Sequence, residues 1–414
     1  MADVTVVGGG IGGMVAARRL ALAGREVTLL EASDRLGGTV SSHEVGDIRL
    51  DAAAESFATR GGIVQGLLEK LGLGDDVVTP DGTGAWLYRL TGDAVPLPAT
   101  AVLGIPGQPL AADVVRVIGW KAAWRAQLDS LLPSLESRPD ISLGDLVRRR
   151  MGSGVLDGLV APVVHGVHSV HPDDIAADRA APGLRTATAR RGLAEAVRGM
   201  RAAAPAGAAA AGIRGGVHRL ADALAADLTR FGVDVRLGER VDDPSSLPGR
   251  VMVAAPSLLS EPGRRIVLVT LVLDAPELDA APRGSGLLVT KGAPGVTARA
   301  LTHGTAKWSW LREVAAGRHV VRLSYETEPA DVLAVARRDA ATLLGVELPS
   351  SAVVDAARVE WTRAAPATDA PEWALGEAVA GSGIAGIVKH ADATVDRMLA
   401  ADDEGAGPDG TDPS

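Results

Sequence analysis

The sequence predicts an α/β protein in which a doubly wound domain is assembled from three separated chain segments and accompanied by a second domain. Strands and helices alternate at the start of the chain, and this alternation stops, resumes near Gly215 and resumes again near Val353. The length of 414 residues is enough for two or three domains. The apolar fraction of 47% is sufficient for a large buried core.

A glycine-rich stretch separates the first strand from the first helix. Asp3–Val7 is a short β-branched run that is typical of a buried parallel strand. Gly8–Gly13 follows, Met14–Leu22 has helical spacing, and Glu26–Leu30 is a second apolar strand that ends at Glu31. Together they have the ~30 residues expected of a dinucleotide-binding strand–helix–strand unit.

Each glycine of the G-x-G-x-x-G motif has a physical role in such a unit. Gly8 permits the turn out of the strand, Gly10 lets a pyrophosphate approach the backbone, and Gly13 lets the helix pack on the sheet. Glu31, 18 residues after Gly13, is placed to accept hydrogen bonds from ribose hydroxyls. Because the chain contains 50 glycines, the motif alone also fits a plain turn. The order of strand, motif, helix, strand and acid favours the dinucleotide site.

The residues after Glu31 distinguish FAD from NAD, which share this unit. The run Glu31–Thr39 resembles the E-x-x-x-R-x-G-G sequence of the amine-oxidase-like flavoproteins, in which it follows the FAD pyrophosphate toward the flavin. Arg35 offers a fixed guanidinium fork to a phosphate, and Gly37 and Gly38 let the backbone pass beside the cofactor. The alternative for Arg35 is a surface ion pair with a neighbouring carboxylate.

Further elements follow from the same periodicities. Helices are expected at 61–73, 111–132, 143–164, 217–231 and 330–344, and after Gly386. Strands are expected at 86–90, 94–97, 233–237, 251–255, 266–273, 285–290, 319–325 and 353–361. Residues 185–211 are rich in Ala and Arg and are expected to be partly a surface loop.

Composition and charge narrow the function classes. The net charge of −9 disfavours nucleic acid as the main partner, because phosphate binding needs a basic face. The absence of cysteine excludes disulfides, cysteine-ligated metal and a thiol nucleophile. His165, His168 and His171 lie three apart but lack an accompanying metal-site signature, so no metal is expected. We find no signal peptide and no apolar run long enough for a transmembrane helix, and we expect a cytoplasmic protein.

From the dinucleotide motif onward, most of the chain resembles the porphyrinogen oxidases of haem synthesis, a branch of the same flavoprotein group. The resemblance rests on the order of the segments Asp51–Phe57, Gly92–Pro98, Asp145–Gly152, Pro162–His168, Gly215–Leu220, Lys307–Trp310, Arg322–Tyr325 and Gly381–Gly386. The first of these resembles the segment that passes the flavin ring, and Lys307–Trp310 and Arg322–Tyr325 resemble late strands of the substrate domain. Ala53 stands where the family commonly has Gly, a late Tyr is missing, and the last glycine segment is a few residues short.

The resemblance implies FAD as the cofactor. The residues it assigns to cofactor binding are Gly8, Gly9, Gly10, Ile11, Gly12, Gly13, Glu31, Ala32, Arg35, Gly38, Thr39, Ala54, Glu55, Val241, Trp361, Gly383 and Gly386. The arginines that could meet substrate propionates by bidentate pairing are Arg60, Arg89, Arg179 and Arg322. For each arginine the alternative is a surface or structural role. No catalytic base is assigned, because the flavin performs the oxidation and ring deprotonation could be solvent-assisted.

The implied function is FAD-dependent oxidation of a porphyrinogen to the porphyrin, with oxygen as electron acceptor and hydrogen peroxide as product. The Ala- and Arg-rich, Lys-poor composition resembles that of actinobacteria, and such bacteria use the coproporphyrin route to haem. This favours coproporphyrinogen III over protoporphyrinogen IX as the substrate. Two alternatives stay open: another flavin oxidase that acts on amines or polyenes, and a non-catalytic relative that has kept the fold. The sequence does not indicate an oligomeric state.

The expected architecture is a Rossmann-type FAD-binding domain of three segments, plus a substrate domain with a mixed sheet and a helical insert. The expected boundaries are 1–75, 213–262 and 353–400 for FAD binding, 76–212 for the insert, 263–352 for the sheet and 401–414 for a disordered acidic tail. Ala99–Leu132 carries Trp120, Trp124 and nearby basic residues. We expect it to cover the mouth of a substrate tunnel or to make weak, salt-sensitive contact on the inner face of the cell membrane.

Overall fold

The computed structural model describes residues 3–82, 84–133, 140–168, 170–203 and 210–405, and it confirms the predicted α/β fold. The chain divides into two compact units. Unit 1 comprises Met1–Thr79, Ala208–Ile266 and Val359–Ser414, and unit 2 comprises Pro80–Gly207 and Val267–Arg358. A Rossmann-type domain of three separated segments, with a second domain of mixed sheet and helices, is the architecture that the sequence predicts.

Unit 1 is built on a parallel sheet with the strand order β12-β2-β1-β13. The strands are β12 (Asp234–Leu237), β2 (Val27–Glu31), β1 (Val4–Val7) and β13 (Arg250–Val253). Every residue of β1 is buried, as expected of a β-branched strand that is covered on both faces. An isolated parallel bridge between Val253 and Ala374 places the C-terminal segment beside β13.

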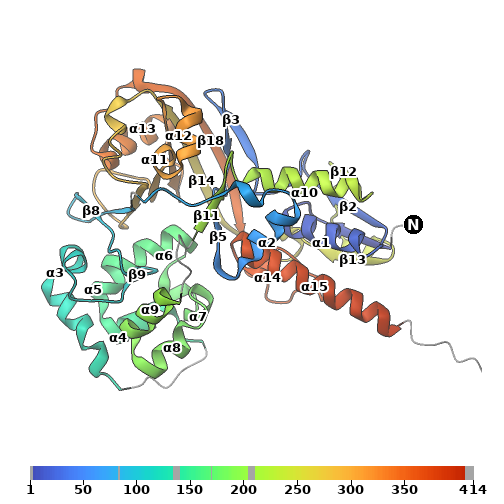
Figure 1. Cartoon of the computed structure of the whole chain (residues 1–414), viewed down its shortest axis with the longest axis horizontal. Coiled ribbons are helices and arrows are strands. Elements are labelled where there is room, and N and C mark those ends of the chain that lie inside the picture. Colours follow the sequence, from blue (N-terminus) through green and yellow to red (C-terminus); the bar gives the residue numbers. More distant parts are fainter. Residues whose placement is uncertain (1–2, 83, 134–139, 169, 204–209, 406–414) are drawn as a thin grey trace, which may run out of the picture. The chain divides into compact units, whose positions relative to one another are not determined.

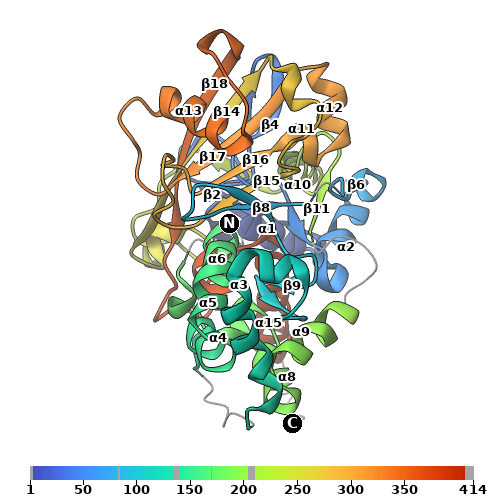
Figure 2. The same ribbon diagram turned by 90° about the vertical axis from the view of Figure 1, so that its left-hand side faces the viewer.

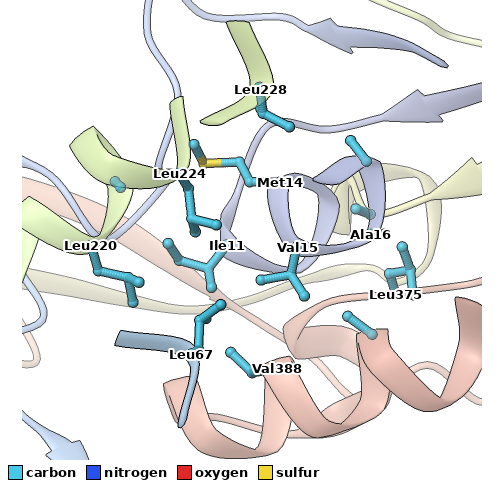
Figure 3. Packing of buried hydrophobic residues seen from close by; sticks show 14 of the residues in the cluster. Ile11, Met14, Val15, Ala16, Leu67, Leu220, Leu224, Leu228, Leu375 and Val388 are labelled. Atoms are coloured by element: carbon cyan, nitrogen blue, oxygen red, sulfur yellow. The ribbon is translucent and has the colours of Figure 1, made fainter. Parts of the chain in front are cut away.

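Helices from all three segments of unit 1 pack together, with α10 and α15 directly on α1 and with α2 and α14 on α15 (Figure 1). They are α1 (Ile11–Leu22), α2 (Ile63–Lys70), α10 (His218–Arg230), α14 (Glu377–Ala380) and α15 (Ile384–Gly405). Met14 and Val15 of α1, Leu224 of α10 and Val388 of α15 are buried in one cluster (Figure 3). The three segments are therefore held together by one hydrophobic core behind the dinucleotide motif.

Short strands complete unit 1. β3 (Ser42–Val45) and β4 (Ile48–Asp51) form an antiparallel hairpin. β11 (Ala210–Ile213) pairs with β5 (Phe57–Ala58) and with β6 (Val77–Val78).

A mixed sheet lies largely in unit 2 (Figure 2), with the start of β14 and the end of β18 assigned to unit 1. Its strand order is β18-β14-β17-β16-β15-β7-β8. The strands are β18 (Val353–Ala364), β14 (Pro262–Leu273), β17 (His319–Tyr325), β16 (Ala300–His303), β15 (Gly286–Val289), β7 (Trp86–Tyr88) and β8 (Ala94–Pro96). β15 pairs with β7 in parallel, whereas the pairs β14–β17, β17–β16 and β16–β15 are antiparallel. The associated helices are α11 (Gly304–Lys307), α12 (Ser309–Ala315) and α13 (Val332–Leu344).

The remainder of unit 2 is a helical insert (Figure 2). Its helices are α3 (Ala112–Gln127), α4 (Leu143–Met151), α5 (Ser153–Val155), α6 (Ala161–His168), α7 (Ala177–Ala180), α8 (Leu184–Arg191) and α9 (Leu193–Ala202). A short hairpin of β9 (Ala101–Val102) and β10 (Ile105–Pro106) precedes them. Gly119, with a φ of 76°, interrupts α3. Arg150 and Asp129 form an ion pair with side chains only 3% and 2% exposed, which anchors the insert internally.

Residues 185–211, expected to be partly a surface loop, form most of α8, all of α9 and the start of β11 where they are described, because Ala and Arg are strong helix formers. Residues 204–209 of this stretch lie outside the described part. Two other sequence expectations differ from the structure. Lys307–Trp310, expected in a strand, ends α11 and begins α12, since Leu, Arg, Glu and Ala follow and favour a helix. α15 continues to Gly405, past the expected start of the tail at residue 401, and residues 406–414 lie outside the described part.

Candidate functional site

The dinucleotide loop lies between β1 and α1, at the carboxyl edge of the parallel sheet. Gly8 has a φ of 107° and donates its N–H to the carbonyl oxygen of Leu30 at 2.8 Å. A Cβ atom on Gly13 would lie 1.9 Å from the carbonyl oxygen of Gly8, and one on Gly8 would lie 2.7 Å from the backbone nitrogen of Ala255. Close packing of backbone against backbone therefore requires glycine at both positions.

Gly10 has a different environment from its neighbours in the motif. Its φ of −69° is accessible to any residue, and a Cβ atom there would meet no heavy atom within 4 Å. Gly10 is the N-cap of α1, and no side chain caps that end of the helix. The loop thus combines open space beside the backbone with the positive end of a helix dipole, which is the combination that binds phosphate groups.

The Glu31 carboxylate bridges the end of β2 and the dinucleotide loop. Its Oε2 atom accepts a hydrogen bond from the Gly9 backbone N–H at 2.6 Å. Its Oε1 atom accepts from the Ser33 backbone N–H at 2.8 Å and from the Ser33 hydroxyl at 2.7 Å. A carboxylate has about four lone-pair sites, so capacity remains for one ribose hydroxyl. Sequence reasoning missed the loop-bracing role of Glu31 and the contribution of Ser33.

The stretch after Glu31 runs beside the dinucleotide loop. Gly37 donates its N–H to the Gly9 carbonyl oxygen at 2.8 Å, and a parallel bridge joins Gly37 to Gly10. Arg35 is exposed and donates from Nη1 to the Gly38 carbonyl oxygen at 3.0 Å. The Arg35 side chain is therefore turned along its own segment in this structure, and its exposed guanidinium retains free surface.

The third segment of unit 1 covers the other side of the loop. A Cβ atom on Gly12 would lie 3.2 Å from the nitrogen and Cα atoms of Gly376. Gly383, with a φ of 116°, precedes α15 and accepts the Ile387 N–H at 3.2 Å, and Gly386 lies exposed in the first turn. Sequence reasoning missed Gly376. Its signal was a glycine directly after an apolar run, the same pattern that marks Gly8.

Glu377 adds a carboxyl group next to Gly376. Burial raises its pKa, while the Arg363 guanidinium, 3.5 Å away, acts in the opposite direction. This acid was also missed, since nothing in the local sequence separates it from a surface glutamate.

Backbone hydrogen bonds link some of the remaining cofactor candidates to this edge. The Glu239 N–H donates to the Glu31 carbonyl oxygen at 2.9 Å, which brings the segment containing Val241 beside the end of β2. Ala54 donates its N–H to the Thr39 carbonyl oxygen at 3.3 Å. The described contacts do not place Trp361 beside the loop, because it lies within β18, the strand that pairs with β14.

The four candidate substrate arginines lie on separate elements. Arg60 is exposed in unit 1, and Arg179 is exposed on α7. Arg322 is half-buried within β17, opposite Thr270 of β14. Arg89 pairs with both carboxylate oxygens of Asp93 and also donates to a carbonyl oxygen of α3 at 3.1 Å. The Arg89 guanidinium is thus already bonded within unit 2, which favours a structural role over substrate binding.

Among the histidines that lie three apart, the rings of His165 and His171 meet edge to face at 6.0 Å. The His168 side chain lies outside the described part. His165 also lines a cavity of about 250 Å³ with Lys291 and Arg299. Across the described residues, no group of three or more His, Asp and Glu side chains is placed to hold a metal ion.

The residues around the loop fit a dinucleotide cofactor. The open face at Gly10 is a cradle that a side chain would fill, and the uncapped start of α1 lies beside it. The Glu31 carboxylate stands at the end of the adjacent strand, where a ribose would lie. An anion-binding helix end and a sugar-binding acid are the two features that such a cofactor requires.

Comparison with known proteins places this geometry in a family. Residues 11–249, more than half of the chain, match the model of the flavin-containing amine oxidoreductases. A protein of Propionibacterium freudenreichii named coproporphyrinogen III oxidase is 29% identical over 182 residues, 44% of this chain and 34% of that protein. A protein of the same name from Mycobacterium tuberculosis is 28% identical over 411 residues, 87% of this chain and 86% of the relative. The chain thus spans about a third of the first relative and most of the second.

Solved structures share the fold. A crystal structure of a proposed protoporphyrinogen oxidase from Exiguobacterium sp. 255-15 has a TM-score of 0.78 at 23% identity, covering 96% of this chain and 98% of that chain. Putrescine oxidase bound to putrescine has a TM-score of 0.64 at 16% identity, covering 96% and 99%. The chain therefore belongs to the flavin-containing amine oxidoreductase family, and its cofactor is FAD.

Proposed function

We propose that this protein oxidises a porphyrinogen to the porphyrin, with coproporphyrinogen III as substrate and coproporphyrin III as product. The observation that carries the proposal is the alignment with the mycobacterial coproporphyrinogen III oxidase, which extends over 87% of the chain and therefore covers both units. Protoporphyrinogen IX is the alternative substrate, since it differs from coproporphyrinogen III only in two peripheral side chains.

The overall reaction balances with oxygen as the acceptor. A porphyrinogen loses six electrons and six protons in three two-electron steps, and three molecules of oxygen become three of hydrogen peroxide. FAD, when bound, supplies a two-electron acceptor for each step. The protein then needs to bind and orient the substrate and to exclude water, and no acid–base residue is assigned.

The residues of unit 1 hold the cofactor in this proposal. The loop from Gly8 to Gly13 and the start of α1 receive the pyrophosphate, and Glu31 receives a ribose hydroxyl. Gly38, Thr39, Ala54 and Glu55 continue along the cofactor, and Val241 meets the adenine through its backbone. The assigned set is completed by Ala32, Arg35, Gly383 and Gly386. Trp361 is the least supported member, because the described contacts do not link it to the loop.

The substrate carries propionate groups, which guanidinium forks bind well. Arg322 is the best supported candidate, because it lies half-buried in the sheet of unit 2. Arg60 and Arg179 are weaker candidates because they are exposed, and Arg89 is weaker because Asp93 engages it.

The function is tested by incubating the FAD-loaded protein with each porphyrinogen in air. We expect porphyrin fluorescence to rise faster with coproporphyrinogen III, with three hydrogen peroxide molecules formed for each porphyrin. A carotenoid 3,4-desaturase of Haloarcula japonica is 59% identical to this chain over a short match of 49 residues. A polyene is therefore the appropriate comparison substrate. Oxidation of the polyene or of an amine, with neither porphyrinogen consumed, would refute the proposal, and bound flavin that none of them reduces would indicate a non-catalytic relative.

We further propose weak peripheral membrane contact through α3 and the turn that follows it. Trp120, Trp124, Leu128 and Leu131 recur at helical spacing and are largely exposed, with Lys121 on the same helix. Aromatic and basic residues on one helix favour an interfacial position. No helix in the described ranges is long and apolar enough to cross a membrane. Co-sedimentation with anionic vesicles should be detectable at low salt and lost at high salt, and binding that salt does not affect would contradict this.

A further inference from the structure

Asp51 lies at the end of β4, where its carboxylate reaches the start of α10. Oδ2 accepts a hydrogen bond from the Val217 backbone N–H at 2.9 Å. Oδ1 accepts from the His218 backbone N–H at 2.8 Å and contacts the His218 Nδ1 atom at 2.8 Å. Because a carboxylate only accepts hydrogen bonds, Nδ1 carries the proton of this contact. The two side chains are 8% and 3% exposed, so water does not compete for these bonds.

The turn before α10 is shaped around this pair. Gly216 has a φ of 110°, which L-residues with side chains rarely adopt. A Cβ atom on Gly216 would lie 2.4 Å from the His218 ring and 3.0 Å from the Asp51 Oδ1 atom. A side chain at this position would therefore displace the pair, which explains the glycine at Gly216.

Asp51 also pairs with Ser42 at the end of the β3–β4 hairpin, and a ladder of backbone bonds continues from there to the dinucleotide loop. Ala52 donates its N–H to the Ser41 carbonyl oxygen at 2.8 Å, and Ala54 donates to the Thr39 carbonyl oxygen at 3.3 Å. The Gly37 N–H in turn donates to a carbonyl oxygen of the loop at 2.8 Å. Residues 52–54 are thus bound to residues 39–41, and these continue from the stretch that lies against the loop.

Helix α10 also packs on α1 and on the stretch beside the dinucleotide loop. Its Leu220 and Leu224 share a buried cluster with Met14 of α1 (Figure 3). A Cβ atom on Gly37 would lie 2.9 Å from the Ala221 Cβ atom, so α10 also packs directly on the cofactor-facing stretch. The Asp51–His218 pair therefore joins the start of residues 52–54 to the same helix that packs on Gly37.

We propose that Asp51 and His218 are positioning residues that hold residues 37–55 in the arrangement FAD requires, without touching the cofactor. The proposal rests on FAD as the cofactor and deepens the proposed function. Without the pair, residues 52–55 would keep their backbone bonds to residues 39–41 but lose their link to α10, and FAD binding would have to order them.

The test measures FAD affinity rather than turnover. Apoprotein is titrated with FAD, and binding is followed by the change in flavin fluorescence. Asp51→Ala removes all three bonds, and His218→Leu removes the side-chain donor alone. We expect each variant to weaken FAD binding by about tenfold or more, since hydrogen bonds to a buried charged group are lost. His218→Asn places an amide nitrogen where Nδ1 stands and should restore most of the affinity.

Asp227→Ala is the matched control. Asp227 pairs with Arg18 at 2.7 Å and joins α10 to α1 near the other end of α10, with side chains 17% and 8% exposed. Its loss should lower the melting temperature of the apoprotein but leave FAD affinity within about twofold of wild type. Hydrogen exchange at residues 37–55 should rise in Asp51→Ala and His218→Leu and not in the control.

Three outcomes would overturn the positioning role: wild-type affinity in His218→Leu, no recovery in His218→Asn, or an equal affinity loss in Asp227→Ala. If Asp51→Ala fails to fold, the two His218 variants decide the question by themselves. Failure of the wild-type apoprotein to take up FAD would instead overturn the cofactor assignment on which the proposal rests.

Discussion

Replacing Gly10 and Gly13 by alanine should separate cofactor binding from folding. At Gly10 the backbone conformation suits alanine, and the added methyl meets no heavy atom within 4 Å. The cost to the apoprotein should be about 1 kcal/mol or less, the size of a weakened N-cap. The methyl would instead occupy the space into which the pyrophosphate is placed. Overpacking of this kind costs roughly 1–3 kcal/mol, so we expect FAD affinity to fall about tenfold or more.

At Gly13 the expected outcome is reversed. The added Cβ atom would lie 1.9 Å from the Gly8 carbonyl oxygen, and a backbone atom cannot turn away as a flexible side chain can. Helix α1 must move from β1, at a cost of about 3 kcal/mol or more. Urea unfolding of the two apoproteins measures the change in stability, and FAD titration measures the change in cofactor affinity. Gly10→Ala with wild-type FAD affinity, or Gly13→Ala with wild-type stability, would show that the loop does not work in this way.

Three further predictions follow from individual side chains. Glu31→Ala should weaken FAD binding by on the order of 1.5–3 kcal/mol, because a ribose hydroxyl loses its acceptor. It should also lower apoprotein stability, because the N–H groups of Gly9 and Ser33 lose theirs. Unchanged affinity in a calorimetric FAD titration would remove Glu31 from the site. Burial lowers the pKa of His303 from 6.5 to about 4, so between these pH values the unfolded chain binds a proton that the folded chain does not, and stability falls as pH falls. Between pH 7 and pH 5 the unfolding free energy should decrease by about 2 kcal/mol more in wild type than in His303→Gln. Equal pH dependence in the two proteins would contradict this. Asp129→Ala should destabilise the helical insert by about 3–5 kcal/mol, because it leaves the Arg150 charge buried without its carboxylate, and a melting temperature equal to that of wild type would count against it.

The parts of the site that could be predicted from the sequence are those in which neighbours along the chain create the structure. The spacing of Gly8, Gly10 and Gly13 after a β-branched run is enough to indicate the loop, because strand, turn and helix are contiguous. The fold class followed for the same reason, since each strand–helix repeat is local.

Contacts between distant segments could not be read in this way. Asp51 and His218 are 167 residues apart, and Gly376 reaches the loop from the last segment of unit 1. Each sequence neighbourhood is ordinary by itself, and the function of these residues arises only when the sheet brings the segments together. The helix after Trp308 was mistaken for a strand because an apolar aromatic pair fits either structure, and the helix formers that follow decide it.

The central claim, that this FAD-binding chain oxidises a porphyrinogen, is tested most directly by flavin bleaching without oxygen. The FAD-loaded protein is mixed with coproporphyrinogen III in a stopped-flow instrument, and the absorbance of oxidised flavin is followed. We predict rapid bleaching with about three flavins reduced for each porphyrinogen consumed, as the six-electron oxidation requires. Flavin that stays oxidised with coproporphyrinogen III and with protoporphyrinogen IX, yet is bleached by an amine or a polyene, would contradict the account.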